Sequence, residues 1–120
     1  WRLRERGIHV SIDDFGTGHT SLRLLRELPV DVLKLDGTFV RMLDGSAGDA
    51  ITRSTVGLAH ALDLAVVAEW VESAAQADTL GAMGCEYAQG RYYSGSLSAS
   101  EFVAWMTGSD PKKTSRVAVA

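Results

Sequence analysis

The stretch IHVSIDDFGTGHTSLRLLREL, residues 8–28, contains the structural unit on which the rest of the chain is built. Ile8, Val10 and Ile12 alternate with polar residues, which indicates a strand with one buried face. Two aspartates and the glycine-containing turn FGTG follow, and then come leucines at helical spacing, at positions 22, 25 and 28. The stretch therefore predicts a strand, a loop and a helix in that order.

Three further strand-like runs follow along the chain: VDVLKLD (30–36), LAVVAEW (64–70) and CEYAQG (85–90). The helices that follow them are expected at about residues 47–62, 73–84 and 100–107. A loop is expected between the run that ends at residue 36 and the helix that begins near 47. Strands that alternate with helices at this spacing predict an α/β fold with a parallel sheet.

Three details of the helices can be predicted as well. The first of these later helices should carry Ile51, Thr55, Leu58 and Leu62 on one face, because they are spaced by four, three and four residues. Gly84 is expected to end the second helix, and Ser98 or Ser100 to cap the third. The opening WRLRERG (1–7) resembles the end of a preceding helix stopped by Gly7, and residues 108–120 are expected to form a flexible tail. The expected domain therefore covers residues 8–107.

Composition restricts the class of protein. The 120 residues carry a net charge of −3, which disfavours DNA, RNA and anionic membranes as partners. The single cysteine, Cys85, has no partner for an internal disulfide, and no apolar run approaches the roughly 20 residues of a membrane span. The chain also lacks the residue order of a signal peptide, so we expect a cytosolic protein with no membrane segment.

Polar residues gather where the predicted strands end. If the apolar face of each strand is covered by helices, the opposite face carries five polar side chains, namely Asp13, Lys34, Asp36, Glu69 and Gln89. The carboxyl ends of parallel strands form one edge of the sheet, where barrels and open α/β sheets place their active sites. We therefore expect these side chains to lie together.

The adjacent carboxylates of Asp13 and Asp14 indicate a cation site. Two like charges repel each other unless a cation lies between them, and Mg²⁺ and Mn²⁺ prefer oxygen ligands of this kind. Two such ions can clamp a phosphoryl group. From residues alone Lys34 has two roles that stay open: it orients a nucleophilic water or stabilises phosphoryl charge, or it only neutralises the acidic cluster.

Four motifs together resemble the C-terminal half of the EAL domain: DDFGTG (13–18), LPVDVLKLD (28–36), VVAEWVES (66–73) and GCEYAQG (84–90). That family comprises bacterial cyclic di-GMP phosphodiesterases, which hydrolyse cyclic di-GMP to pGpG with two Mg²⁺ or Mn²⁺ ions. The resemblance implies the last four βα units of a TIM-like (β/α)₈ barrel. Such a half barrel is a parallel sheet with helices on one face.

The resemblance also implies roles for individual residues. Asp13 and Asp14 match the metal-binding pair, and Glu69 matches the glutamate at the metal and water site. Lys34 matches the catalytic lysine, and Gln89 the glutamine that closes the last strand near it. Two residues match supporting positions: Asp36 at the strand end, and Glu72, which steadies the loop after the aspartates. The segment that family members use in dimer contacts and in coupling to sensory domains matches Phe15, Gly16, Thr17 and Gly18.

The chain departs from the family pattern near the expected substrate pocket. Trp70 stands where the family usually has glycine, so it is expected to twist the loop or fill the pocket, or else to offer a stacking surface for guanine. Three further departures are Gly37 for a basic residue, Arg91 for an aromatic one and Ser96 for proline. These changes affect the fit of the substrate more than the binding of metal.

The name-giving Glu-Ala-Leu segment and its downstream metal ligands do not occur in the chain. We therefore expect a piece of a phosphodiesterase that is inactive alone, in a protein that is a homodimer and carries a sensory or GGDEF domain upstream. Such a protein is expected in the bacterial cytoplasm, or as the cytosolic part of a larger sensor. The exposed sheet edges of a half barrel also predict self-association of the isolated chain. The alternative is a degenerate EAL module that binds cyclic di-GMP or a protein partner without hydrolysis.

Overall fold

A computed structural model describes residues 3–16, 22–43, 45 and 47–108. Four strands form one parallel sheet in the order β1-β2-β3-β4. The strands are β1 (Ser11–Phe15), β2 (Val32–Leu35), β3 (Ala65–Ala68) and β4 (Tyr87–Ala88). The predicted parallel α/β sheet is confirmed, and its shape fits a partial barrel.

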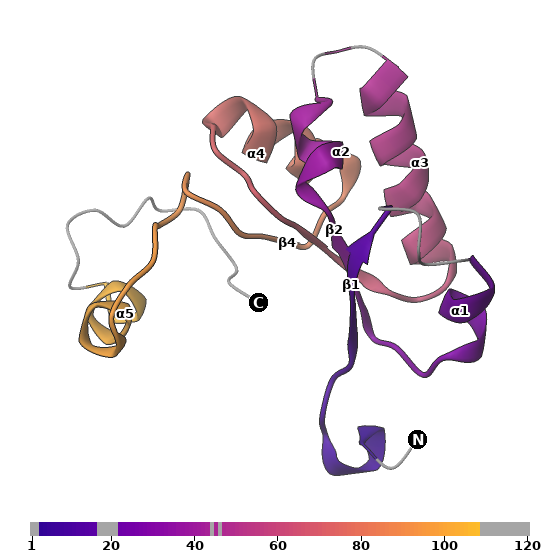
Figure 1. Ribbon diagram of the computed structural model, residues 1–120, viewed down its shortest axis with the longest axis horizontal. Coiled ribbons are helices and arrows are strands. Elements are labelled where there is room, and N and C mark those ends of the chain that lie inside the picture. Colours follow the sequence, from indigo (N-terminus) through magenta and orange to yellow (C-terminus); the bar gives the residue numbers. More distant parts are fainter. Residues whose placement is uncertain (1–2, 17–21, 44, 46, 109–120) are drawn as a thin grey trace.

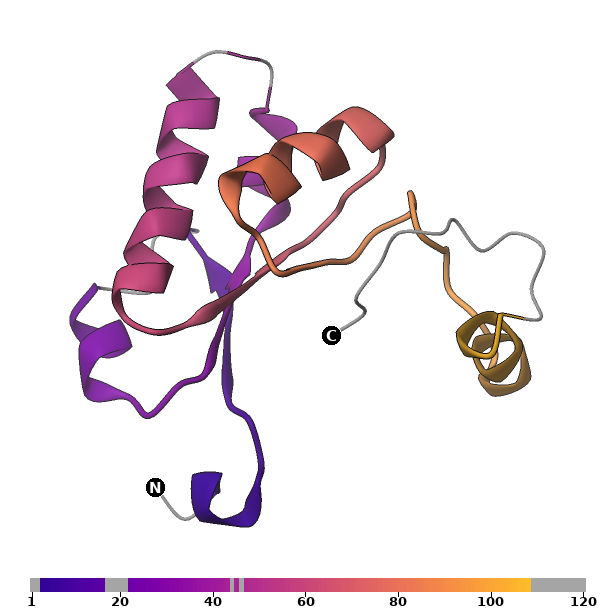
Figure 2. The ribbon, with the colours of Figure 1, turned by 180° about the vertical axis from the view of Figure 1, so that it is seen from behind.

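Five α-helices and one 3₁₀ turn are present in the described part of the chain. They are η1 (Arg4–Arg6), α1 (Leu22–Glu27), α2 (Gly37–Arg41), α3 (Ala47–Ala61), α4 (Ala74–Met83) and α5 (Ala99–Met106). Figures 1 and 2 show α2, α3 and α4 gathered over one side of the sheet, whereas α5 stands apart from them. None of the helices in the described residues is long and apolar enough to cross a membrane.

Local sequence signals explain where two of these helices begin and end. Ser73 caps α4 through a capping box with Gln76, and Gly84 ends that helix in the left-handed conformation with φ of 98°. A second capping box begins α5, where Ser98 accepts from the backbone N–H of Glu101. Of the two serines predicted as the cap of this helix, Ser98 is therefore the one used.

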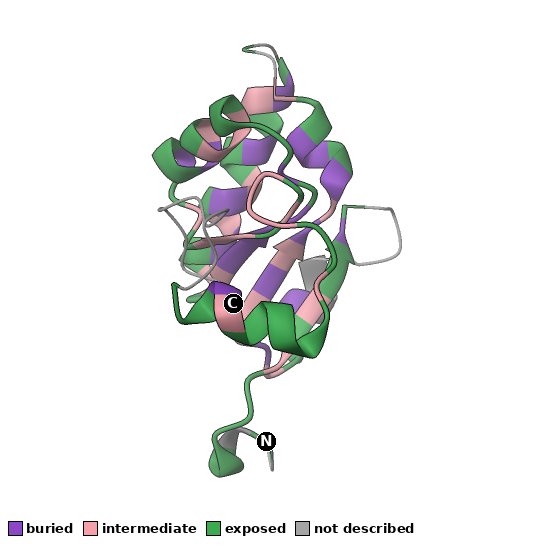
Figure 3. Cartoon of the chain, turned by 90° about the vertical axis from the view of Figure 1, so that its left-hand side faces the viewer, coloured by how far each residue is buried: buried purple, intermediate pink, exposed green. Residues whose placement is uncertain are grey.

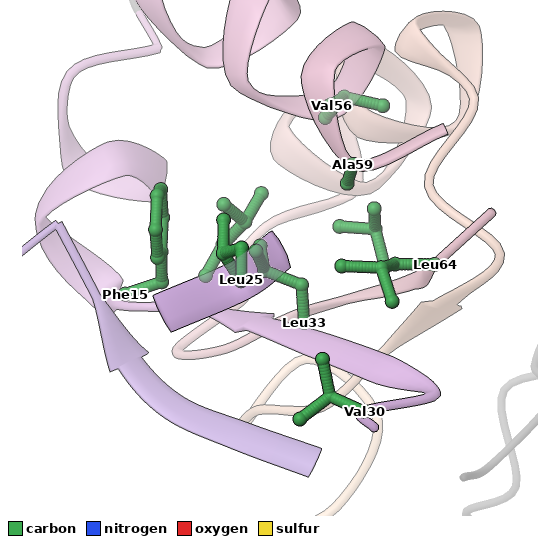
Figure 4. Close-up of a cluster of buried hydrophobic side chains, with 9 residues drawn as sticks. Phe15, Leu25, Val30, Leu33, Val56, Ala59 and Leu64 are labelled. Carbon is green, nitrogen blue, oxygen red and sulfur yellow. The ribbon is translucent and has the colours of Figure 1, made fainter. Parts of the chain in front are cut away.

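The hydrophobic core lies between the sheet and the helices that cover it. Its larger cluster takes side chains from β1, β2, β3, α1 and α3 and the segments beside them: Phe15, Leu25, Val30, Leu33, Leu35, Val56, Ala59, Leu64 and Val66. Figure 4 shows these side chains converging between the strands and the helices, and Figure 3 shows the buried parts of the chain concentrated there. A second cluster of Val40, Ala68, Val71 and Leu80 joins α2 and α4 to the other end of the sheet. The sheet is thereby fixed from one face, and its polar face stays open.

The short helix α2 was predicted to be a loop. Asp36 is its N-cap, and the Asp36 carboxylate accepts a hydrogen bond of 2.9 Å from the backbone N–H of Thr38. Phe39 and Val40 are both buried, so tertiary packing holds a helix that is too short to be stable by itself. The apolar pattern of five residues was too short to indicate it.

The face of α3 that carries Ile51, Thr55, Leu58 and Leu62 is only partly buried: Thr55, Leu58 and Leu62 are half-buried, and Leu62 packs against the larger core cluster. Ile51 is exposed, and the buried residues of the helix are Gly48, Thr52, Val56 and Ala59. Small residues allow α3 to pack close to α2. The buried hydroxyl of Thr52 has a hydrogen-bond partner, because it donates to the carbonyl of Gly48 at 3.0 Å. The apolar spacing therefore marked a neighbouring face of the helix.

Smaller corrections concern the first thirty residues. Ile8 and Leu28, predicted to lie on the apolar faces of the first strand and helix, each leave nearly half of their surface exposed, because β1 begins only at Ser11 and α1 ends at Glu27. The N-terminal segment forms the 3₁₀ turn η1 rather than the end of an α-helix, although Gly7 is left-handed as expected, with φ of 71°. The predicted tail lies outside the described residues beyond 108.

Candidate active site

The two adjacent aspartates lie in β1, at an irregularity of the strand. The register between β1 and β2 shifts between Ile12 and Phe15, and Asp14 has a left-handed backbone with φ of 53°. Ile12 and Phe15 are three residues apart, so a regular strand would place them on opposite faces. The bulge lets both side chains pack into the core. Asp13 and Asp14 are consequently both exposed, whereas regular alternation would have put them on opposite faces.

Lys34 extends from the middle of the sheet to two of the predicted site carboxylates. Its ammonium lies 2.8 Å from Oδ1 of Asp13 and 2.6 Å from Oε1 of Glu69. The parallel pairing of β1, β2 and β3 accounts for this contact, because Lys34 lies in the central one of these three strands. The structure therefore brings together three residues that are far apart in the sequence.

Glu69 is the buried member of the group. Its side chain is 8% exposed, and it follows β3 directly. The amide of Gln89, which follows β4, donates to Oε1 of Glu69 at 2.7 Å, so this oxygen accepts from both Gln89 and Lys34. The hydrogen bonds from Gln89 and Lys34 hold the buried carboxylate of Glu69 in one orientation.

These contacts alter the protonation equilibria of the site. The hydrogen bond from Lys34 holds the pKa of Asp13 below its usual value. Partial burial by itself lowers the pKa of Lys34, but the hydrogen bonds to Asp13 and Glu69 outweigh it and raise that pKa above its usual value. Lys34 is therefore a cation at neutral pH and acts as a hydrogen-bond donor rather than as a base.

Asp13, Asp14 and Glu69 have the spacing of a metal site. One carboxylate oxygen of each lies within 4.8 Å of one oxygen of the other two. Oxygens at this separation can contact one ion at the 2.0–2.6 Å distances typical of Mg²⁺ and Ca²⁺. The three residues therefore fit a hard divalent cation, and the ammonium of Lys34 lies against two of them.

The backbone after β4 holds Gln89 in place. Gly90 has φ of 155°, and a Cβ atom there would lie 2.2 Å from the carbonyl oxygen and 2.3 Å from the nitrogen of Val71. Val71 donates to the carbonyl of Gln89 at 3.0 Å and accepts from Tyr92 at 3.0 Å. The segments after β3 and β4 are thus joined through Val71, an arrangement that the strand patterns did not reveal. The glycine directly after the polar residue was its only signal in the sequence.

Replacing Gly90 by alanine should lower the free energy of unfolding by about 1–3 kcal/mol, because the added methyl group meets backbone atoms and the φ angle is unfavourable. Urea unfolding followed by circular dichroism measures the change. Gly95→Ala is the matched control, since a Cβ at Gly95 meets nothing within 4 Å. Equal stability of the two variants would contradict this account of the close approach.

Two of the predicted supporting residues lie outside the ion-pair group. Asp36 uses its carboxylate to cap α2, and hydrogen bonds from the side chain and the backbone N–H of Thr38 lower the pKa of Asp36. Glu72 is exposed, and its backbone N–H donates to the side chain of Gln76 at 2.8 Å. Its predicted contact with the loop after the aspartates involves residues 17–21, which are outside the described residues. Its supporting role stays a prediction.

The predicted dimer segment is described only in part. Phe15 belongs to β1 and is buried in the core, so it is not an exposed contact residue. Gly16 is exposed and has φ of 106°, and a Cβ there would lie 2.0 Å from the ring of Phe39. Thr17 and Gly18 are outside the described residues. The role of this segment in a dimer stays a prediction.

Trp70 and Arg91 lie beside the site. Trp70 follows Glu69 directly, has a left-handed backbone with φ of 60° and leaves 58% of its surface exposed. It lines a surface hollow together with Glu72, Gln89, Gly90 and Arg91. The backbone of the loop is thus left-handed at Trp70, and the ring lies against Gly37.

Comparison with known proteins identifies the fold. The family model described as the EAL domain matches residues 1–96. The uncharacterized protein Rv1354c of Mycobacterium tuberculosis is 48% identical to the chain over 94 residues, which are 78% of the chain and 15% of that protein. The chain therefore spans a small part of the length of this curated relative.

Solved structures agree with this comparison. The EAL domain of Mycobacterium smegmatis DcpA has a TM-score of 0.83 and 42% identity, over 89% of this chain and 48% of that domain. The PaMucR phosphodiesterase in complex with c-di-GMP has a TM-score of 0.76 and 38% identity, over 84% and 41% of the two chains. Klebsiella pneumoniae BlrP1 with manganese and c-di-GMP has a TM-score of 0.68 and 35% identity, over 78% and 24%.

Proposed function

Because the chain belongs to the EAL domain family, we propose that it forms the second half of the active site of a phosphodiesterase that hydrolyses cyclic di-GMP to pGpG. The observation that carries the proposal is the ion-pair group at the strand ends, in which Lys34 contacts both Asp13 and Glu69. Asp14 adds a further carboxylate to the same place.

In this proposal Asp13, Asp14 and Glu69 hold divalent cations, Mg²⁺ or Mn²⁺, of which the complete domain binds two. When bound, such ions lower the pKa of a water molecule and neutralise charge on phosphoryl oxygens. A manganese complex of the related BlrP1 supports the use of a divalent metal. The hydrogen bond from Gln89 orients the carboxylate of Glu69, one oxygen of which lies within 4.8 Å of a carboxylate oxygen of each aspartate.

Lys34 acts as a fixed positive charge in the proposed reaction. Its raised pKa keeps it protonated, so it cannot remove a proton from water at neutral pH. Asp13 and Glu69 engage two of its three N–H donors, and the remaining donor and the positive charge orient the attacking water or stabilise the negative charge that develops on the phosphoryl group. Gln89 keeps Glu69 beside Lys34 and thereby positions both groups.

The half-site is tested by comparing the 120-residue chain with a completed barrel. The chain alone, incubated with Mn²⁺ and cyclic di-GMP, should release negligible pGpG, because about half of the metal ligands are supplied by the missing strands. A fusion to the first half of the DcpA EAL domain, of which the chain covers 48%, should restore metal-dependent hydrolysis. Robust release of pGpG by the chain alone would contradict the claim that it supplies only half of the active site. A fusion that folds but releases no pGpG would contradict the proposed phosphodiesterase activity.

A second function is favoured by one observation. Trp70 is held in a left-handed backbone directly after Glu69, where the family usually has glycine. A degenerate EAL module that binds cyclic di-GMP or a protein without hydrolysing it is the corresponding alternative. The Trp70→Gly variant of the fused barrel distinguishes the two candidate functions. If the parent fusion is an active phosphodiesterase, the variant also hydrolyses cyclic di-GMP. If Trp70 has inactivated the module, the parent fusion is inert and the variant gains hydrolysis.

The setting of the site in the cell is part of the same proposal. We place the protein in the bacterial cytoplasm, where it acts as a homodimer under the control of a sensory or GGDEF domain that precedes it. The proposed dimer contact is Gly16, Thr17 and Gly18, the part of the predicted segment that follows Phe15, and analytical ultracentrifugation of the complete protein tests it.

A further inference from the structure

The backbone around Trp70 fixes the place of its ring. Glu69 donates its N–H to the carbonyl of Leu35 at 3.2 Å, and Val71 donates to the carbonyl of Gln89 at 3.0 Å. Both neighbours of Trp70 are buried, so the residue between them has little freedom. A bulky residue with positive φ is strained, and such strain persists only where the surroundings determine the conformation.

The ring rests on a glycine at the start of α2. A Cβ atom at Gly37 would lie 2.7 Å from Cγ and 2.7 Å from Cδ1 of Trp70, which is closer than any side chain allows. The absence of a side chain at Gly37 therefore creates the place that the indole occupies. Packing on Gly37 covers only part of the ring, because Trp70 stays 58% exposed. The indole is thus both held in position and accessible.

The exposed part of the ring borders a hollow beside the proposed active site. The hollow has a volume of about 400 Å³, within the roughly 300–1,000 Å³ of small-molecule sites, and Arg91 and Gln89 line it with Trp70. Gln89 also donates to Glu69, which connects the hollow with the ion-pair group. An aromatic face stacks on any nucleobase, and a guanidinium donates to phosphate or to the acceptor edge of guanine.

We infer that Trp70 is a stacking platform for one guanine base of the substrate and that Arg91 donates hydrogen bonds to the same nucleotide. This inference rests on the proposed function, because the nucleotide is that of the proposed substrate. It assigns to this chain a subsite that binds a nucleobase, and the absence of a side chain at Gly37 leaves the space in which the indole of that subsite lies. It predicts that the stacking contact forms without any metal ion.

The test measures binding of GMP and of cyclic di-GMP to the 120-residue chain in the presence of EDTA, by quenching of tryptophan fluorescence and by calorimetry. Trp70→Gly should weaken binding of both nucleotides about tenfold or more, because base stacking on an aromatic residue contributes that much to affinity. Trp70→Phe should keep the affinity within about threefold, and Arg91→Ala should weaken it about tenfold.

Trp70→Gly is the informative variant because glycine adopts a φ of 60° without strain. It should therefore be at least as stable as the parent chain in urea unfolding, so a loss of binding cannot be attributed to misfolding. Unchanged nucleotide affinity in Trp70→Gly, or no binding by the parent chain at millimolar nucleotide, would overturn the inference. Either result leaves the proposed hydrolysis intact, because that is measured as metal-dependent release of pGpG by the fused barrel.

Discussion

Replacing Lys34 by methionine in the fused barrel is expected to lower the rate of cyclic di-GMP hydrolysis by about 10²–10³-fold, measured as initial release of pGpG at saturating substrate. Methionine preserves much of the length of the side chain but removes the charge that lies 2.8 Å from Asp13 and 2.6 Å from Glu69. The expected loss is that of one preorganised electrostatic donor in an enzyme active site. Lys34→Arg is the control that keeps the positive charge.

The same variant separates the two roles that the sequence leaves open for Lys34. If the lysine only neutralises the acidic cluster, divalent cations can replace it, and activity should recover as the Mn²⁺ concentration is raised. If it positions water or stabilises phosphoryl charge, the loss should persist at saturating Mn²⁺. We expect the second result, together with unchanged or tighter Mn²⁺ binding, since the ammonium no longer lies against two of the metal ligands. Recovery of activity with Mn²⁺ would contradict the catalytic role.

Strand alternation predicted the contact between Lys34 and Glu69 because β2 and β3 are regular. Leu33 and Leu35 are buried as the pattern requires, so the residue between them must point to the open face of the sheet. The same argument places Glu69 one residue beyond the buried end of β3. Where pairing is regular, the sequence is sufficient to locate a site residue.

The arrangement of Asp13 and Asp14 was beyond this kind of reasoning. Alternation places Asp14 on the same face as Ile12, toward the core, and only the left-handed backbone of Asp14 moves it out. A bulge leaves no mark on the apolar pattern when the inserted residue is polar. The contact between Trp70 and Gly37 was hidden for a related reason, because it joins the start of α2 to the segment after β3, whose backbone conformation depends on tertiary hydrogen bonds.

Glu69→Gln should weaken Mn²⁺ binding to the chain by about 100-fold or more and reduce hydrolysis in the fused barrel by about 10³-fold. Glutamine has nearly the same shape as glutamate but supplies one neutral carbonyl oxygen where the cluster has a charged carboxylate. The change also leaves the ammonium of Lys34 with one carboxylate partner instead of two. Isothermal calorimetry with Mn²⁺ measures the first effect, and release of pGpG measures the second.

Asp78→Asn on α4 is the matched control for Mn²⁺ binding, since it removes the same charge from an exposed position outside the cluster. It should change Mn²⁺ affinity by less than about threefold, because exposed charges at a distance are screened by salt. If Glu69→Gln and Asp78→Asn weakened Mn²⁺ binding equally, the cation would be held by the net charge of the surface and not by the three carboxylates. A specific loss in Glu69→Gln would instead place the buried carboxylate in direct contact with the ion, because only a ligand depends on the identity of one oxygen.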